Sequence, residues 1–234
     1  MRSSSTTVDS MTNKETILFD LDGTLIDHFT TIHRSIAYAQ EQLGLPQSSY
    51  ETVKATVGGS ITVTLERLLG ANQVEAALVH FKAHFREIMF EDVFALPGAG
   101  WILQALKERG YKVGVYTNKI QKHSEETLTH LGLDQWLDQI IGTGEHPYRK
   151  PQPEFTLYAL DQIESSLETT LLIGDSPFDY QTGANAQMDV ILVATGTHNQ
   201  DQLFEETGCD AIYPDLYELG YRVFGLDAQQ SAHT

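Results

Sequence analysis

One stretch decides the fold of this chain: Ile17-Leu18-Phe19-Asp20-Leu21-Asp22-Gly23-Thr24-Leu25. Its first three residues are apolar, which is typical of a buried strand in a parallel sheet. Side chains two residues apart on a strand face the same way, so Asp20 and Asp22 share one face at the carboxyl end of that strand. Gly23 then allows a sharp turn.

Open α/β sheets bind ligands at this end of their strands. Two neighbouring carboxylates, Asp20 and Asp22, repel each other unless a cation or a proton lies between them. The stretch therefore predicts a site for a charged ligand. The alternative is a surface turn that carries two acids.

The composition indicates which kinds of partner this protein is expected to bind. The chain has 234 residues, of which 15 are basic and 32 acidic, and its net charge is −17. Such a charge repels nucleic acid and anionic membranes, so we expect neither as a partner. The single cysteine, Cys209, cannot form an internal disulfide, no apolar run approaches membrane-spanning length, and the polar N-terminus is unlike a secretory signal. We therefore expect a cytoplasmic protein, monomeric or homodimeric, that acts on a small molecule.

The chain changes character along its length. We expect residues 1–14 to form a flexible leader and residues 227–234 a loose tail. Between residues 28 and 95 the pattern is helical without a strand, and the expected helices cover 31–43, 49–57, 61–69 and 72–90. From residue 96 onwards strands and helices alternate. The expected strands are 111–116, 139–141, 170–173, 190–193 and 211–213, and the main expected helices are 99–109, 121–131, 153–163 and 177–187.

This alternation predicts an α/β fold, because strands that alternate with helices form a parallel sheet covered on both faces. The predicted core, residues 15–27 and 96–226, is a three-layer, Rossmann-like parallel sheet. Residues 28–95 are predicted to be an inserted α-helical cap. An insert that follows Asp20 and Asp22 directly would lie over the ligand end of the sheet and act as a lid. The alternative is a helical decoration remote from the site.

Further polar groups fall at comparable places in the chain. Thr117 and Asn118 end one expected strand, Asp175 ends another, Asp179 follows one helical turn later, and Lys150 precedes an expected helix. Taken singly, each has an ordinary alternative, a helix cap for Thr117, Asn118 and Asp175 and a solvated loop residue for Lys150. A parallel sheet brings its strand ends to one edge, which favours a common site.

Together these groups fit phosphoryl transfer. Asp20, Asp22 and Asp175 offer the hard oxygen ligands that Mg²⁺ prefers, and Lys150 and Thr117 can hold the oxygens of a dianion. One carboxylate can attack phosphorus to form an aspartyl-phosphate, while a second protonates the leaving oxygen and then activates water. Hydrolysis of a phosphate monoester requires metal, cation and acid–base groups together because its uncatalysed rate is so low.

The same residues resemble four motifs of the haloacid dehalogenase superfamily. DLDGTL at 20–25 is similar to the first motif, VYTN at 115–118 to the second, KPQP at 150–153 to the third and GDSPFD at 174–179 to the fourth. The helical insert is similar to the cap of the branch that contains phosphoglycolate phosphatase and β-phosphoglucomutase. His28 departs from the Ser or Thr that the family often has at the first linker, and we expect this to leave the chemistry unchanged.

The resemblance implies roles for individual residues. Asp20 would be the nucleophile and Asp22 the acid/base, and Lys150 would complete the catalytic set. Mg²⁺ would be bound by the Asp20 carboxylate, the Asp22 backbone carbonyl and Asp175, with Asp179 supporting it through water.

The resemblance also assigns substrate contacts. Phosphate would be bound by Thr117, Asn118 and Lys150. The cap loop Val57-Gly58-Gly59-Ser60 resembles that of the phosphoglycolate phosphatases, so Gly58, Gly59 and Ser60 would contribute to substrate specificity.

The expected activity is Mg²⁺-dependent hydrolysis of a small phosphorylated metabolite, phosphoglycolate-like or a sugar phosphate, through an aspartyl-phosphate. A phosphosugar mutase of the β-phosphoglucomutase type, and a pyrophosphatase or nucleotidase on the same scaffold, are alternatives. A receiver-like phospho-acceptor is disfavoured because it needs neither Asp22 nor a lid. A dehalogenase is disfavoured because it needs neither Mg²⁺ nor Asp22.

Overall fold

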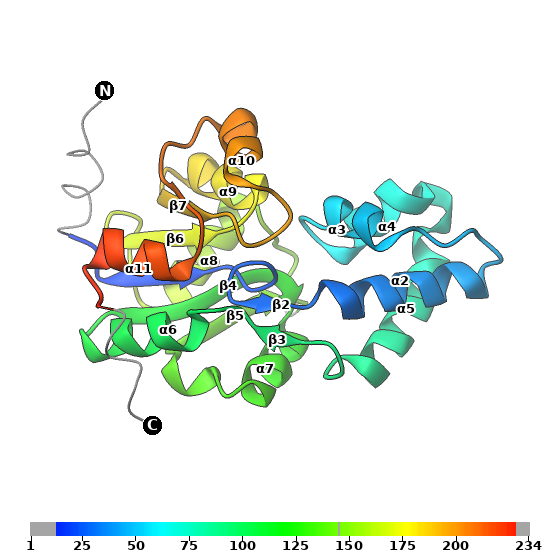
Figure 1. The fold of residues 1–234 in the computed structure, drawn as a ribbon, viewed down its shortest axis with the longest axis horizontal. Helices are drawn as coiled ribbons and strands as arrows, with labels where there is room; N and C mark the ends of the chain where they lie inside the picture. The colour runs from blue at the N-terminus through cyan, green and yellow to red at the C-terminus, as the bar shows by residue number, and fades with distance from the viewer. Residues whose placement is uncertain (1–12, 145, 228–234) are drawn as a thin grey trace.

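The computed structural model describes residues 13–144 and 146–227, which form a sheet-based core and a helical insert (Figure 1). The core sheet has six strands in the order β5-β4-β1-β6-β7-β8, and every neighbouring pair is parallel. The strands are β1 (Thr16–Phe19), β4 (Lys112–Ile120), β5 (Gln139–Thr143), β6 (Thr170–Gly174), β7 (Asp189–Val193) and β8 (Ile212–Tyr213). The predicted parallel α/β fold is confirmed.

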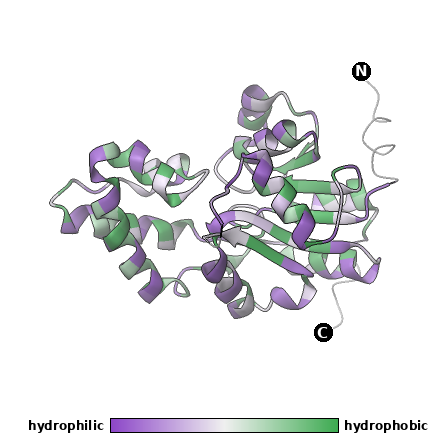
Figure 2. Ribbon diagram, turned by 180° about the vertical axis from the view of Figure 1, so that it is seen from behind, coloured by the Kyte–Doolittle hydropathy of each residue, from purple (hydrophilic) through white to green (hydrophobic). Residues whose placement is uncertain are grey.

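Helices cover both faces of this sheet, because the side chains of each strand alternate between two separate apolar clusters. Ile17 and Phe19 of β1 belong to the cluster that includes α6 (Ala99–Glu108), α7 (Gln121–His130) and α11 (Leu216–Phe224). Leu18 points the other way, into the cluster with α8 (Pro153–Gln162). α9 (Pro177–Ala186) and α10 (Gln200–Thr207) complete the second face, and Figure 2 shows the strands between these layers as mostly hydrophobic.

The insert consists of four helices with a core of their own. They are α2 (Phe29–Gln42), α3 (Tyr50–Thr56), α4 (Ile61–Leu69) and α5 (Val74–Ile88). Apolar residues at helical spacing, such as Ile32 and Ile36 on α2 and Phe81 and Phe85 on α5, form a cluster that contains no core-sheet residue. Two short 3₁₀ helices, η1 (Ala71–Gln73) in the insert and η2 (Asp134–Trp136) in the core, connect longer elements.

Two crossings of the chain join the insert to the core. β2 (Ile26–Asp27) precedes α2 and pairs antiparallel with β3 (Phe94–Ala95), which follows α5. The prediction that residues 28–95 contain no strand is therefore wrong at Phe94 and Ala95. A two-residue strand is too short to show alternation in the sequence. The exact limits of core and cap stay predictions.

Two further boundaries differ from expectation. β4 continues to Ile120 instead of ending at Tyr116, with a shift in its register against β5 between these two residues. Lys14, the last residue of the predicted leader, is buried and forms an ion pair of 2.6 Å with Asp189 at the start of β7. The rest of the predicted leader up to residue 12, and the predicted tail from residue 228, lie outside the described residues. No helix in the described part of the chain combines the length and apolarity of a membrane span.

The packing of α9 on β7 generates a stability prediction. A Cβ added at Gly183 would overlap the Val190 side chain and lie 2.8 Å from the Met188 carbonyl oxygen. Gly183→Ala should therefore lower the free energy of unfolding by about 1–3 kcal/mol, the usual cost of overpacking. In the matched control Gly100→Ala, on α6, the new Cβ meets only Leu133 Cδ2 at 3.7 Å. That variant should gain up to about 1 kcal/mol from helix propensity. Denaturant unfolding measures both, and equal effects would contradict the packing argument.

Candidate active site

The turn after β1 places the first two acids. Gly23 has φ of +93°, and its N–H donates to the Ile26 carbonyl at 2.8 Å, so the chain folds back towards β2. A Cβ at Gly23 would lie 2.5 Å from Asp175 Oδ2. Glycine is therefore required here both for its backbone conformation and for the close approach of an acid from β6. The turn leaves Asp20 and Asp22 at the carboxyl edge of the sheet.

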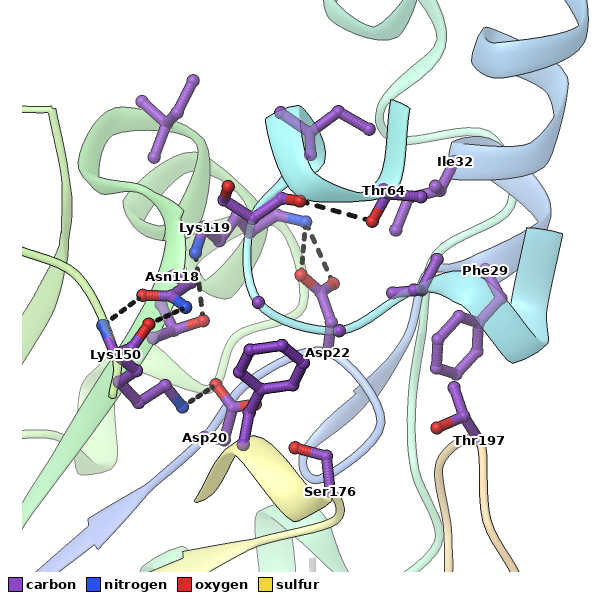
Figure 3. Close-up of a pocket in the computed structure, with 18 of the residues that line it drawn as sticks. Asp20, Asp22, Phe29, Ile32, Thr64, Asn118, Lys119, Lys150, Ser176 and Thr197 are labelled. Atoms are coloured by element: carbon purple, nitrogen blue, oxygen red, sulfur yellow. Dashed lines mark hydrogen bonds and ion pairs between the residues drawn. The ribbon is translucent and has the colours of Figure 1, made fainter. Parts of the chain in front are cut away.

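Lys150 lies between two carboxylates, and Figure 3 shows its contact with that of Asp20. Its Nζ is 2.9 Å from Asp20 Oδ1 and 2.6 Å from Asp179 Oδ1, and its side chain is 2% exposed. Asn118 holds the backbone of Lys150 on both sides, accepting from its N–H at 2.7 Å and donating to its carbonyl at 3.1 Å. Burial alone would lower the pKa of Lys150, but the Asp179 and Asp20 carboxylates outweigh it and raise the pKa. The alternative of a solvated loop lysine is wrong.

Asp179 organises the start of α9. Its carboxylate is fully buried, and Oδ2 accepts from Ser176 Oγ at 2.6 Å and from the backbone N–H groups of Ser176 and Asp175 at 3.2 Å each. Ser176, not Asp175, occupies the N-cap position of the helix. Asp175 instead accepts a hydrogen bond from Thr24 Oγ1 at 2.9 Å and faces Gly23. The capping alternative for Asp175 is therefore wrong.

Three carboxylates fit a hard divalent cation. One oxygen from each of Asp20, Asp175 and Asp179 lies within 4.8 Å of the others. Burial raises the pKa of Asp20 to about 6 even though Lys150 opposes the rise, and burial also raises the pKa of Asp175 well above its usual range. Asp20 Oδ1 is buried, and its partner is Lys150 Nζ at 2.9 Å, which Asp179 shares. A second cation beside Lys150 would supply the missing positive charge.

Asp22 has a different partner from Asp20. Lys119 Nζ lies 2.9 and 3.0 Å from the two carboxylate oxygens of Asp22, so this carboxylate is ion-paired (Figure 3). The sequence interpretation missed Lys119. The available signal was its position two residues after Thr117, because alternate residues of a strand share a face.

His28 lies beside this ion pair. Its Nε2 is 2.8 Å from the Met89 carbonyl oxygen, which can only accept, so Nε2 carries the proton. Lys119 Nζ then donates to Nδ1 at 3.2 Å. Burial, with the charge of Lys119, lowers the pKa of His28 to about 3, which keeps the imidazole neutral.

The carboxyl edge of the sheet, where the acids lie, also includes the last residues of β4 and the loop after β7. Thr117 and Asn118 are buried and lie within β4, and neither caps α7, whose N-cap is Ile120. Thr195 Oγ1 donates to the Gly23 carbonyl at 2.7 Å. This loop contains Gly196, where a Cβ would overlap the Asp175 carboxylate, and Thr197, which lines the site. The sequence interpretation missed the loop because its residues carry no charge.

A cavity of about 120 Å³ lies between the core and the insert. The predicted site residues that line it are Asp20, Asp22, Gly58, Gly59, Ser60, Thr117, Asn118, Lys150, Asp175 and Asp179. The structure therefore brings the predicted site residues together around one cavity. A Cβ at Gly58 or Gly59 would lie 3.1–3.2 Å from the Phe178 ring, so this loop packs closely on the start of α9.

Comparisons with known proteins identify the family of this chain. The family model for haloacid dehalogenase-like hydrolases matches residues 17–193. The phosphoglycolate phosphatase of Aquifex aeolicus is 31% identical over 180 residues, covering 77% of this chain and 84% of the relative. The pyrophosphatase PpaX of Bacillus mycoides is 31% identical over 179 residues, covering 76% of this chain and 83% of the relative.

The fold has solved counterparts. A haloacid dehalogenase-like family protein of Streptococcus pneumoniae superposes with a TM-score of 0.81 at 23% identity, over 89% of this chain and 98% of that one. The matched family, which spans most of the chain, and the relatives at 31% identity lead to one conclusion. This chain belongs to the haloacid dehalogenase-like hydrolases, in their phosphoglycolate phosphatase-like branch, and is a phosphatase of that type.

Proposed function

We propose that this enzyme hydrolyses a small phosphate monoester with the help of Mg²⁺, through an aspartyl-phosphate on Asp20. The observation that carries the proposal is the position of Lys150, which holds Asp20 and Asp179 beside Asp175 at the polar end of the cavity. The names of the two relatives offer phosphoglycolate and pyrophosphate as starting substrates for this chain.

The metal would be held by Asp20, the Asp22 backbone carbonyl and Asp175, with Asp179 as support. When bound, Mg²⁺ would neutralise the oxygens of the phosphate and favour the ionised form of Asp20. Lys150 would hold the same phosphate together with Thr117 and Asn118, which lie at the end of β4.

Asp20 would attack phosphorus and Asp22 would protonate the leaving oxygen. Asp22 would then take a proton from the water that hydrolyses the aspartyl-phosphate. The two acids are suited to different tasks because Asp20 lies against Lys150 and the acid cluster, whereas Asp22 lies against Lys119 and is open to the cavity.

The metal requirement is the first test. Treatment with EDTA should abolish phosphate release, and added Mg²⁺ should restore it, because three buried carboxylates and one lysine leave the site short of positive charge. Phosphate release is measured with a panel of phosphorylated metabolites that includes 2-phosphoglycolate, glucose 6-phosphate and pyrophosphate. The control is EDTA already saturated with Mg²⁺. Full activity after exhaustive chelation would contradict the proposal.

Lys150 gives a second prediction. Lys150→Met should reduce turnover by about 10²-fold or more, the scale of losing one preorganised charge-stabilising group. The variant should also unfold more easily, because it leaves two buried carboxylates unpaired. Lys14→Met is the matched control: it removes another buried, ion-paired lysine, which lies on Asp189 and lines no part of the cavity. It should lose stability but keep the turnover of its folded fraction. Similar turnover in the two variants would show that Lys150 has only a structural role.

The two neighbouring acids should fail differently. Asp20→Asn should form no covalent intermediate with any substrate. Asp22→Asn should lose most hydrolysis of alkyl phosphates, whose leaving oxygen needs a proton, and lose less in the first step with an activated aryl phosphate. The phospho-enzyme should then accumulate, because the second step lacks its base. Rapid quench and mass spectrometry would show the adduct on Asp20. An adduct in Asp20→Asn, or equal losses for both ester types in Asp22→Asn, would overturn the assigned roles.

A further inference from the structure

The cavity has two chemically different ends (Figure 3). The core end carries the acids and lysines that the proposed reaction uses on the phosphate. The insert end is lined by Phe29 and Ile32 of α2 and by Phe81 and Phe85 of α5, and these four side chains are 2–7% exposed. Ile61, in the first turn of α4, extends the same wall. The part of a substrate that projects from the phosphate towards the insert therefore meets a mainly apolar surface.

Most of the lysines that line the cavity are already ion-paired. Among the described lining residues, Lys150 is paired with Asp20 and Asp179, and Lys119 with both oxygens of Asp22. Lys82 on α5 is exposed to solvent. Four carboxylates line the cavity against these three lysines. A substrate with a carboxylate as well as a phosphate adds negative charge to this cavity. Among the described lining lysines, Lys82 alone is not ion-paired, and it is exposed to water.

Hydroxyl groups at the insert end are also engaged locally. Ser60 Oγ accepts from the Val63 N–H at 3.4 Å, and Thr64 Oγ1 donates to the Ser60 carbonyl at 3.3 Å. Both contacts form the first turn of α4. Because Thr64 Oγ1 already donates its proton, these two hydroxyl groups offer few contacts to the several hydroxyl groups of a sugar.

We infer that the preferred substrates are phosphate monoesters of uncharged, apolar or aromatic alcohols, rather than esters that carry a carboxylate or a polyhydroxy sugar. The inference rests on the proposed function, because it names the substrate class of the same cavity. Its physical basis is that an apolar body gains from burial against the α2–α5 wall. A carboxylate loses its water there, and the buried lysines of the described lining are already ion-paired.

A pair of esters of similar shape tests the inference. Isobutyl phosphate carries an isopropyl group where 2-phosphoglycolate has its carboxylate, and benzyl phosphate carries a phenyl ring there. With Mg²⁺ present, kcat/KM for isobutyl and benzyl phosphate should exceed that for 2-phosphoglycolate and glucose 6-phosphate by about 10-fold or more, the scale on which an apolar pocket discriminates. Isobutanol is the poorer leaving group of the isosteric pair, so leaving-group chemistry works against the expected result.

A substitution in the wall supplies the converse test. Ile61→Lys places a cation at the insert end and should shift the ratio of kcat/KM towards 2-phosphoglycolate, relative to isobutyl phosphate, by about 10-fold. Val63→Lys is the matched control, because Val63 is half-buried on the same helix and does not line the cavity. It should keep the wild-type ratio, and thermal unfolding of both variants checks that they are folded.

The outcomes separate this inference from the proposed function. Phosphate release with a preference for 2-phosphoglycolate or glucose 6-phosphate would overturn the inference alone. Equal ratios in Ile61→Lys and Val63→Lys, with both variants folded, would also overturn it. No release from any of the four esters would overturn the proposed function and this inference with it.

Discussion

The buried ion pairs of Lys150 constrain the rest of the site. A lysine and two carboxylates out of water are costly unless each charge is paired, so their positions have little freedom. Lys150 satisfies Asp20 on one side and Asp179 on the other, and Asn118 fixes its backbone through two hydrogen bonds. These residues come from the ends of β1 and β4, the loop before α8 and the start of α9. The parallel sheet, in which β1 lies between β4 and β6, brings the four segments to one edge.

Charge at this edge is divided between two lysines. Lys150 serves Asp20, and Lys119 serves Asp22, although the two acids are two residues apart in the sequence. Asp20 belongs to the acid cluster with Asp175, in which burial raises the pKa of both carboxyls. The Asp22 carboxylate instead lines the cavity and is bound by Lys119. Separate environments of this kind are how one site gives neighbouring carboxyls different tasks.

The sequence predicted which residues lie at the carboxyl edge of the sheet better than it predicted the contacts between their side chains. The sequence pattern identifies Asp20, Lys150 and Asp175, because an acid after an apolar run, or a lysine before a helix, can be recognised from neighbouring residues alone. His28 could not be identified in this way, because its importance comes from a contact with Lys119, which is 91 residues away in the chain. The end of β4 was also misplaced, since a register shift hides the alternation that marks a strand. Helices of the insert were easier, because an apolar stripe repeats over several turns.

The insert and the Asp22 carboxylate belong to one hydrogen-bonded unit. His28 lies on the first crossing between core and insert, and Met89 lies on the second, directly after α5. The hydrogen bond from His28 to the Met89 carbonyl joins the two crossings, and the contact of Lys119 with His28 joins them to Asp22. The same two helices, α2 and α5, carry the apolar wall over the cavity. The contacts of His28 with Met89 and Lys119 therefore position the insert and also determine the surroundings of Asp22. The same few contacts hold the apolar wall at one end of the cavity and Asp22 at its polar end.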